Sequence, residues 1–121
     1  MKDELQSVRE RTKDYALRVI RLYMALSKTN PAQIIGKQLL RSGTSVGAQY
    51  REAHRAKSDA DFVSKIEGAL QELDEAAYWI ELLAESGVVS SRRLAGLVTE
   101  TDELTAILVT ITKRVKARSK P

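Results

Sequence analysis

Apolar residues recur every three or four positions along most of this chain, which is the spacing that places them on one face of an α-helix. The clearest run extends from Phe62 to Leu83 and stops at Ser86 and Gly87. Three other runs have the same period, and residues that start or stop helices separate them. The pattern therefore predicts four helices, at about residues 4–29, 31–56, 59–86 and 91–117.

The predicted boundaries carry residue types that favour them. Pro31 suits the first turn of the second helix, where a backbone N–H has no partner to lose. Ser58 can cap the third helix, and Gly87 has the usual position of a C-terminal stop. Ser90 or Ser91 can cap the fourth helix. The connections between the helices are therefore expected to be short.

The second predicted helix contains three glycines, Gly36, Gly43 and Gly47. Each costs about 1 kcal/mol relative to alanine inside a helix. We expect close packing against another helix, or a local kink at Ser42 and Gly43, to offset that cost. A phosphate-binding loop would need a strand before the glycines, and the run S-G-T-S-V-G follows none.

The same pattern predicts the fold class. Residues 98–112 are rich in valine and threonine, but their three-to-four spacing favours a helix over a strand. Four long helices with short connections are typical of an all-α, antiparallel, up-and-down four-helix bundle. A chain of 121 residues with 43% hydrophobic content suits one domain, residues 1–121, with one core.

Charged residues divide the chain into three blocks of alternating sign. Residues 1–57 carry 12 basic and 5 acidic side chains, residues 58–90 carry 1 and 8, and residues 91–121 carry 7 and 3. The net charge of +4 therefore hides a strong basic, acidic, basic pattern.

The residue types argue against an enzyme or a metalloprotein. The chain has no cysteine, which excludes a disulfide, a thiolate ligand and a cysteine nucleophile. His54 is the only histidine, and its spacing from Glu52 does not match the Glu-x-x-His element of a di-iron bundle. Ser42 and Ser45 lack a third residue to orient a Ser–His pair, and no pocket for a catalytic carboxylate pair is evident. We expect no enzymatic activity, no cofactor and no metal.

The first residues, M-K-D-E-L-Q-S-V-R-E-R, lack the apolar core of a signal peptide. No window approaches the roughly 18 apolar residues of a membrane span. We therefore expect a soluble, cytoplasmic protein.

Three linked motifs lie between Ser45 and Leu83: S-V-G-A-Q-Y-R-E-A, then S-D-A-D-F, then the acidic run E-L-D-E before Tyr78 and Trp79. In these motifs the chain resembles the bacterial four-helix bundle proteins of the 23S ribosomal RNA intervening-sequence family, and the likeness extends over nearly the whole chain. Gln49 stands where asparagine is common in that family. The other matching residues are Glu52, Ser58, Asp61, Phe62, Glu72 and Glu75.

The resemblance implies a left-handed antiparallel bundle that assembles into a homo-oligomeric ring, with a pentamer favoured, and a non-enzymatic link to nucleic acid. Members of the family are encoded within inserts of ribosomal RNA genes. Related accessory proteins join a reverse transcriptase to its RNA in diversity-generating retroelements. The resemblance supplies no binding residues, so we select these from charge.

Basic residues of the first and fourth helices are predicted to converge as a nucleic-acid interface. In an antiparallel four-helix bundle the start of the first helix and the end of the fourth lie at the same end, so their potentials add. With few aromatic residues to stack on bases, binding should be directed at the phosphate backbone and sensitive to salt. The family resemblance favours RNA over DNA. Alternatively, these residues form a solvated helix face and stabilise the dipole of the fourth helix. The candidates are Arg9, Arg11, Lys13, Arg18 and Arg21 on the first helix, and Lys113, Arg114, Lys116, Arg118 and Lys120 on the fourth.

The reversal of charge near Ser58 predicts ion pairs between helices or between subunits, which would fix their register more than they would add stability. The expected pairs are Arg51 and Arg55 with Asp61 and Glu67, Arg41 with Glu75, and, across a subunit boundary, Arg51 with Glu72.

Tyr78 and Trp79 are adjacent on the third predicted helix, so both cannot face one narrow core. One of them should cover the edge of the bundle or a neighbouring subunit, since large aromatic side chains are favoured at interfaces. This favours a homo-oligomer.

Two classes of function remain. The first is a nucleic-acid-binding accessory protein, acting as a homo-oligomer with a basic surface and possible partnership with a reverse transcriptase. The second is a protein-interaction scaffold whose basic face meets an acidic partner, without direct nucleic-acid binding. A steep loss of nucleic-acid affinity with salt is expected only of the first.

Overall fold

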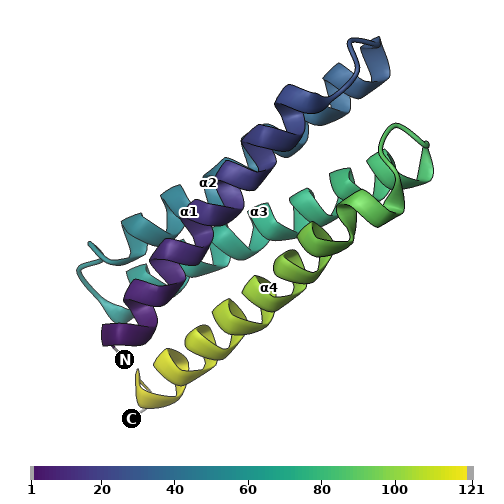
Figure 1. Cartoon of the computed structure of the whole chain (residues 1–121). Helices are drawn as coiled ribbons and strands as arrows, with labels where there is room; N and C mark the ends of the chain where they lie inside the picture. The colour runs from purple at the N-terminus through teal and green to yellow at the C-terminus, as the bar shows by residue number, and fades with distance from the viewer. Residues whose placement is uncertain (1, 120–121) are drawn as a thin grey trace.

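The computed structural model describes residues 2–119, which form four helices. These are α1 (Lys2–Ala25), α2 (Asn30–Ala53), α3 (Asp59–Glu85) and α4 (Ser91–Ser119). Successive helices run in opposite directions, so the start of α1 and the end of α4 lie at the same end of the molecule (Figure 1). The predicted all-α, up-and-down four-helix bundle is confirmed. Within residues 2–119, no helix is long and apolar enough to cross a membrane.

The helices α1 and α2 end a few residues earlier than the sequence pattern predicts, at Ala25 and Ala53 rather than at residues 29 and 56. For α1 the reason lies at Thr29, whose extended backbone (φ −66°, ψ 152°) makes it the N-cap of α2. Pro31 then lies in the first turn of α2, as expected. The side-chain amide of Gln33 donates a 2.8 Å hydrogen bond to the Ser27 carbonyl and so holds the connection together.

Serine side chains cap α3 and α4. The Ser58 hydroxyl accepts a hydrogen bond from the backbone N–H of Asp61 at 3.0 Å. The Ser90 hydroxyl accepts one from the N–H of Arg93 at 3.3 Å, so Ser90 supplies the cap contact that the sequence assigned to either of two serines. Gly87 has a φ of +78°, the left-handed conformation that commonly ends a helix.

The apolar faces of the four helices meet in one core, which is mostly aliphatic and includes two buried tyrosines. The hydroxyl of Tyr15 lies 2.7 Å from that of Thr101, and the hydroxyl of Tyr50 donates to the Leu5 carbonyl at 3.0 Å. Burial raises the pKa of Tyr15 to about 12 and also raises the pKa of Tyr50. Both rings therefore stay neutral at physiological pH.

Glycines on α2 let α1 pack closely against it. The α2 helix is continuous through Ser42 and Gly43. A Cβ atom added to Gly43 would lie 2.8 Å from Cγ2 of Val19, which is closer than real side chains pack. The expected close packing is confirmed. It explains why α2 contains glycines although they are poor helix formers.

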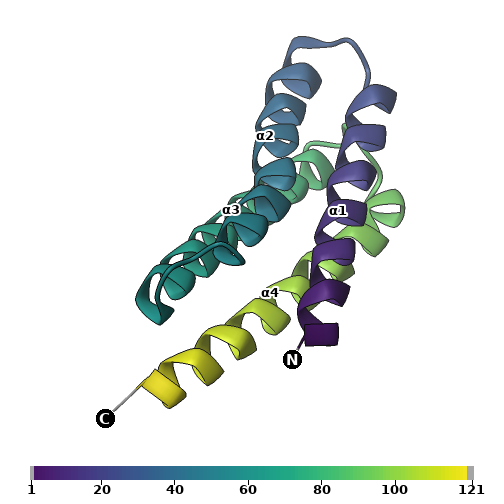
Figure 2. The same ribbon diagram turned by 90° about the vertical axis from the view of Figure 1, so that its left-hand side faces the viewer.

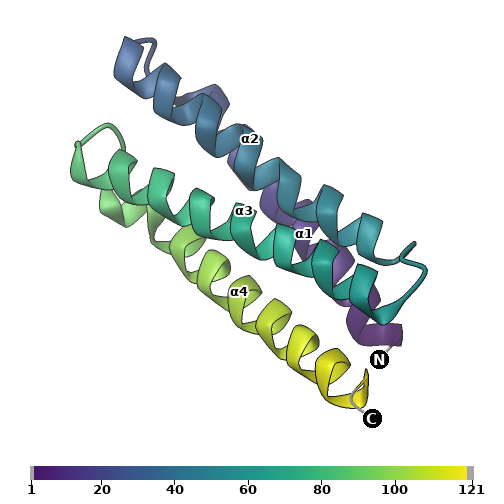
Figure 3. The same ribbon diagram turned by 180° about the vertical axis from the view of Figure 1, so that it is seen from behind.

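Each helix packs against the next one along the chain, α1 on α2, α2 on α3 and α3 on α4. Figure 3 shows α3 between α2 and α4, with α1 behind them. The first and last helices contact each other only over a short stretch, because α1 crosses α4 at an angle (Figure 2). Polar side chains join them there, including Tyr15 with Thr101 and Arg11 with Glu100. The α1–α4 seam is therefore less tightly packed than the other three.

Candidate nucleic-acid interface

The start of α1 and the end of α4 meet as the sequence predicts. Nη1 of Arg114 lies 2.8 Å from a carboxylate oxygen of Glu4, which links the two helices directly. This contact joins a candidate cation to an acid of the same chain. The two basic segments therefore converge in space, but their charges are partly offset there.

Four of the candidate cations form ion pairs within the chain. Arg11 contacts Glu100 at 2.5 Å and Glu103 at 3.1 Å, and the hydrogen bond to Glu100 is the main reason that its pKa is raised. The other three pairs are Arg114 with Glu4, Lys116 with Glu67 at 3.2 Å, and Arg118 with Asp59 at 3.3 Å. These four guanidinium and ammonium groups would have to exchange a carboxylate for a phosphate in order to bind nucleic acid.

The remaining described candidates make no ion pair with residues 2–119: Arg9, Lys13, Arg18, Arg21 and Lys113. Arg9 lies near His54, the residue that follows α2, and the charge of Arg9 adds to burial in lowering the pKa of that histidine. Nη2 of Arg18 lies towards α4, beside Gly96. Lys120 lies outside the described residues.

A groove of about 380 Å³ runs between α1 and α2 and carries two cations. Small side chains leave room for it, and none of its lining residues is acidic. We call this surface the basic groove, lined by Thr12, Lys13, Ala16, Thr44, Gly47, Ala48 and Arg51. Arg9 precedes Lys13 by one helical turn, so the cations continue beyond the groove along α1. Arg55 lies just past the end of α2.

Arg51 does not form the ion pair within the chain that the sequence predicts. It was expected to lie beside Asp61 and Glu67, but it lines the basic groove and makes no ion pair among the described residues. Arg55 also makes none, and Glu67 pairs with Lys116 of α4 instead. The cause is helix rotation, because ten residues separate Arg41 from Arg51 and turn the second side chain about 80° away from the first. The small residues Thr44, Gly47 and Ala48, which precede Arg51 at helical spacing, were the feature of the sequence that could have indicated this groove.

Arg41 forms the ion-pair cluster between α2 and α3. Its guanidinium contacts Glu75 at 3.0 Å, as the sequence predicts, and also contacts Glu72 at 3.3 Å. Burial raises the pKa of Glu72, and Glu75 adds to this effect while Arg41 opposes it. A weaker link joins Lys65 to Glu52 at 3.9 Å. Since Glu72 already has a partner in its own chain, the structure gives no reason to assign it to Arg51 of a neighbour.

The two adjacent aromatic residues of α3 differ in their surroundings. Tyr78 is 53% exposed, whereas Trp79 is partly buried and packs against the core. Their rings meet edge to face with centroids 5.0 Å apart. Tyr78 is therefore the residue available to a neighbouring molecule.

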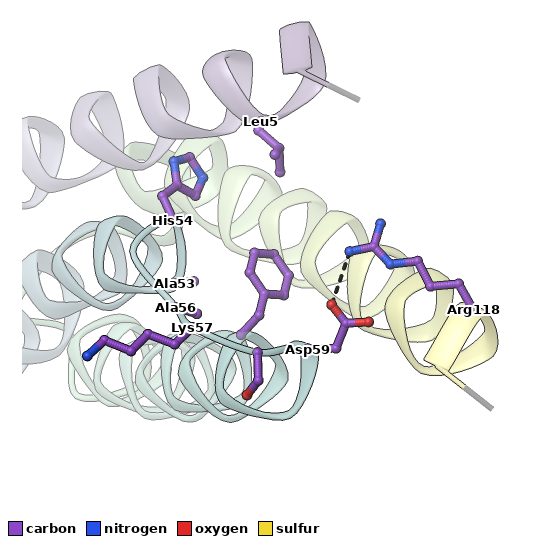
Figure 4. Close-up of a pocket in the computed structure, with 9 residues that line it drawn as sticks. Leu5, Ala53, His54, Ala56, Lys57, Asp59 and Arg118 are labelled. Carbon is purple, nitrogen blue, oxygen red and sulfur yellow. Dashed lines mark hydrogen bonds and ion pairs between the residues drawn. The ribbon is translucent and has the colours of Figure 1, made fainter. Parts of the chain in front are cut away.

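The end of the molecule that holds the termini carries a pocket of about 470 Å³ (Figure 4). His54 and Leu5 lie on one side of it, and the ion pair of Arg118 with Asp59 lies on the other (Figure 4). The pKa of Asp59 is lowered by its hydrogen bonds to Ser119 and Arg118. Since charges of both signs line this pocket, it favours anions less than the basic groove does.

No group of three metal-ligating side chains occurs in the described part of the chain.

Comparison with known proteins gives a family match and similarity to solved structures. The family model described as 23S rRNA-intervening sequence protein matches residues 4–110. A crystal structure of a protein of unknown function from the S23 ribosomal protein family of Bacteroides thetaiotaomicron is similar, with a TM-score of 0.86 and 34% sequence identity. That similarity covers 91% of this chain and 98% of the other. No curated protein matches the chain.

Proposed function

Because the chain belongs to the 23S rRNA-intervening sequence protein family, we propose that it is a non-enzymatic accessory protein that binds the phosphate backbone of nucleic acid through the basic groove. The observation that carries this proposal is the lining of the groove, which includes Lys13 and Arg51 and no acidic side chain. The family description, which refers to ribosomal RNA, favours RNA over DNA.

The physical basis of binding is the release of counterions from the nucleic acid. Each phosphate that a lysine or arginine neutralises frees condensed cations, so affinity falls steeply with salt. Cations without a carboxylate partner contribute most to the affinity for nucleic acid, because they give up no ion pair when they bind a phosphate. No aromatic side chain lines the groove, so contacts to phosphate should dominate over base stacking and sequence discrimination should be weak.

Assembly would strengthen this binding. We propose a homo-oligomer, with a pentameric ring favoured by the family resemblance, in the cytoplasm. Several copies of one weak site on a ring raise the overall affinity without new contacts, because the second and later contacts are intramolecular. Tyr78 supports an interface, since it is a large, exposed aromatic side chain. A reverse transcriptase is the protein partner that the resemblance suggests.

The test is RNA binding by two matched variants across a salt series. Lys13→Glu combined with Arg51→Glu reverses the two charges of the basic groove. Lys28→Glu combined with Lys37→Glu makes the same change in net charge at exposed positions near the α1–α2 connection. The groove variant should bind a structured RNA much more weakly, and the slope of log affinity against log salt should fall by about 2. The control variant should keep most of the affinity.

Equal losses in the two variants would mean that net charge, rather than the groove, attracts RNA, and would contradict the proposed site. Absence of binding by the unmodified protein at low salt would overturn the proposed function. It would favour the second class, a protein-interaction scaffold whose basic face meets an acidic partner.

A further inference from the structure

A second groove follows α3 and α4, away from the basic groove. It consists of two hollows of about 320 Å³ each. Asp74 of one hollow lies one turn from Ala77 of the other on α3, and Thr105 lies one turn from Asp102 on α4, so the hollows follow each other along the same two helices. We call these two hollows together the α3–α4 groove.

This groove combines apolar and acidic side chains. Leu70, Ile80, Val98 and Val109 provide apolar surface, and Val98 is 43% exposed. Three acids also line it, and none of them forms an ion pair with residues 3–119: Asp74, Glu81 and Asp102. No basic side chain lines either hollow. The surface is therefore complementary to a binding partner whose surface is apolar in the middle and positively charged at its edges.

We propose that the α3–α4 groove binds an amphipathic helix of another protein, with large aliphatic residues along one face and lysine or arginine on both flanks. A groove between two packed helices accepts the side-chain ridge of a third helix. The aliphatic side chains would cover the exposed apolar surface. The flanking cations would pair with the three acids, which orients the helix and speeds its association.

Two basic surfaces of a second copy do not fit this groove. One is the basic groove, where Lys13 and Arg51 line a hollow, and two hollow surfaces cannot place their side chains into each other. The other is the end of α4. The cations near the end of α4, Arg114, Lys116 and Arg118, are occupied by acids of the same chain.

The two grooves belong to different helix pairs. The α1–α2 hairpin and the α3–α4 hairpin point apart at the end opposite the termini (Figure 1). A helical partner on the α3–α4 groove therefore leaves the basic groove free for nucleic acid. This inference does not depend on the proposed RNA binding, and either could fail alone.

The probe for the test is a labelled synthetic helix of 18 residues, with leucine along one face and lysine on the flanks, and binding is followed by fluorescence anisotropy. Asp74→Lys combined with Asp102→Lys should weaken its binding about tenfold, because attraction becomes repulsion at both edges. Glu10→Lys combined with Asp14→Lys is the matched control, since it makes the same change in net charge at exposed positions of α1. We expect less than about a threefold effect from the control.

A third variant separates packing from charge. Ala77 is exposed and lines the groove, so Ala77→Trp should fill the groove without disturbing the core. It should weaken binding of the probe about tenfold with no change in charge, and a peptide of the same composition with scrambled leucines should bind poorly to every variant. Circular dichroism spectra and thermal melts of all variants check that each is folded.

Three results would overturn the proposal. The first is equal weakening by the two charge variants, which would indicate attraction by net charge alone. The second is unchanged binding by Ala77→Trp. The third is a pair of observations: the variant with Asp74→Lys and Asp102→Lys no longer forms an oligomer, and the probe competes with self-association of the unmodified protein. Together these would assign the groove to a second copy of the chain.

Discussion

At the scale of single residues, one missing or added carbon decides how closely two helices approach. Gly43 has no space for a Cβ atom, because Val19 of α1 occupies it. Gly96 on α4 is exposed, and its added Cβ would meet only the terminal nitrogen of Arg18, which belongs to a flexible side chain. The two glycines therefore respond in opposite ways to the same substitution.

Gly43→Ala should lower the free energy of unfolding by about 1–3 kcal/mol, because overpacking at a helix contact outweighs the better helix propensity of alanine. Gly96→Ala should leave it unchanged or raise it by up to about 1 kcal/mol, since propensity acts there with little steric cost. Urea denaturation of the two variants measures both effects. A stabilising effect at Gly43 would contradict the close packing of α1 on α2.

At the scale of elements, the helix boundaries depend on capping residues that can be recognised in the sequence. Ser58 accepts the N–H of Asp61 at the start of α3. Two acids in the first turn also favour this end of the helix, where the dipole is positive. The polar cap therefore stabilises α3 in addition to the packing of its apolar face.

Ser58→Ala should lower the free energy of unfolding by about 1 kcal/mol, because the N–H of Asp61 loses its side-chain acceptor. Ser64→Ala is the matched control, since Ser64 is exposed in the interior of α3 and alanine is the better helix former there. Thermal or urea denaturation compares them. If both substitutions had the same effect, the cap would have no measurable role.

At the scale of the whole molecule, the four helices are not equally supported. The central pair, α2 and α3, each packs against two neighbours along its length. The outer pair, α1 and α4, shares only a short polar seam. Local opening of the bundle should therefore begin with the outer helices, since fewer packed side chains hold them.

Hydrogen exchange should reflect this order in the isolated chain, with slower exchange of backbone amides in the middle of α2 and α3 than in the middle of α1 and α4. Exchange followed by mass spectrometry or NMR gives the comparison. Uniform protection across the four helices would indicate that the α1–α4 seam is as stable as the others. A change in protection of α1 on adding RNA would in turn support the basic groove.

The sequence by itself determined the number of helices, their order, the cap at Ser58 and the stop at Gly87, because these depend on periodicity and on contacts within a few residues. It also determined that the basic ends of α1 and α4 meet, since antiparallel topology requires it. Only the tertiary structure decided which charges are paired, because pairing depends on the rotation of each helix about its axis. That rotation brought Arg41 to Glu75, turned Arg51 towards α1, and left Lys13 and Arg51 in a groove without an acid. It also opened the α3–α4 groove, which no short segment of the sequence contains.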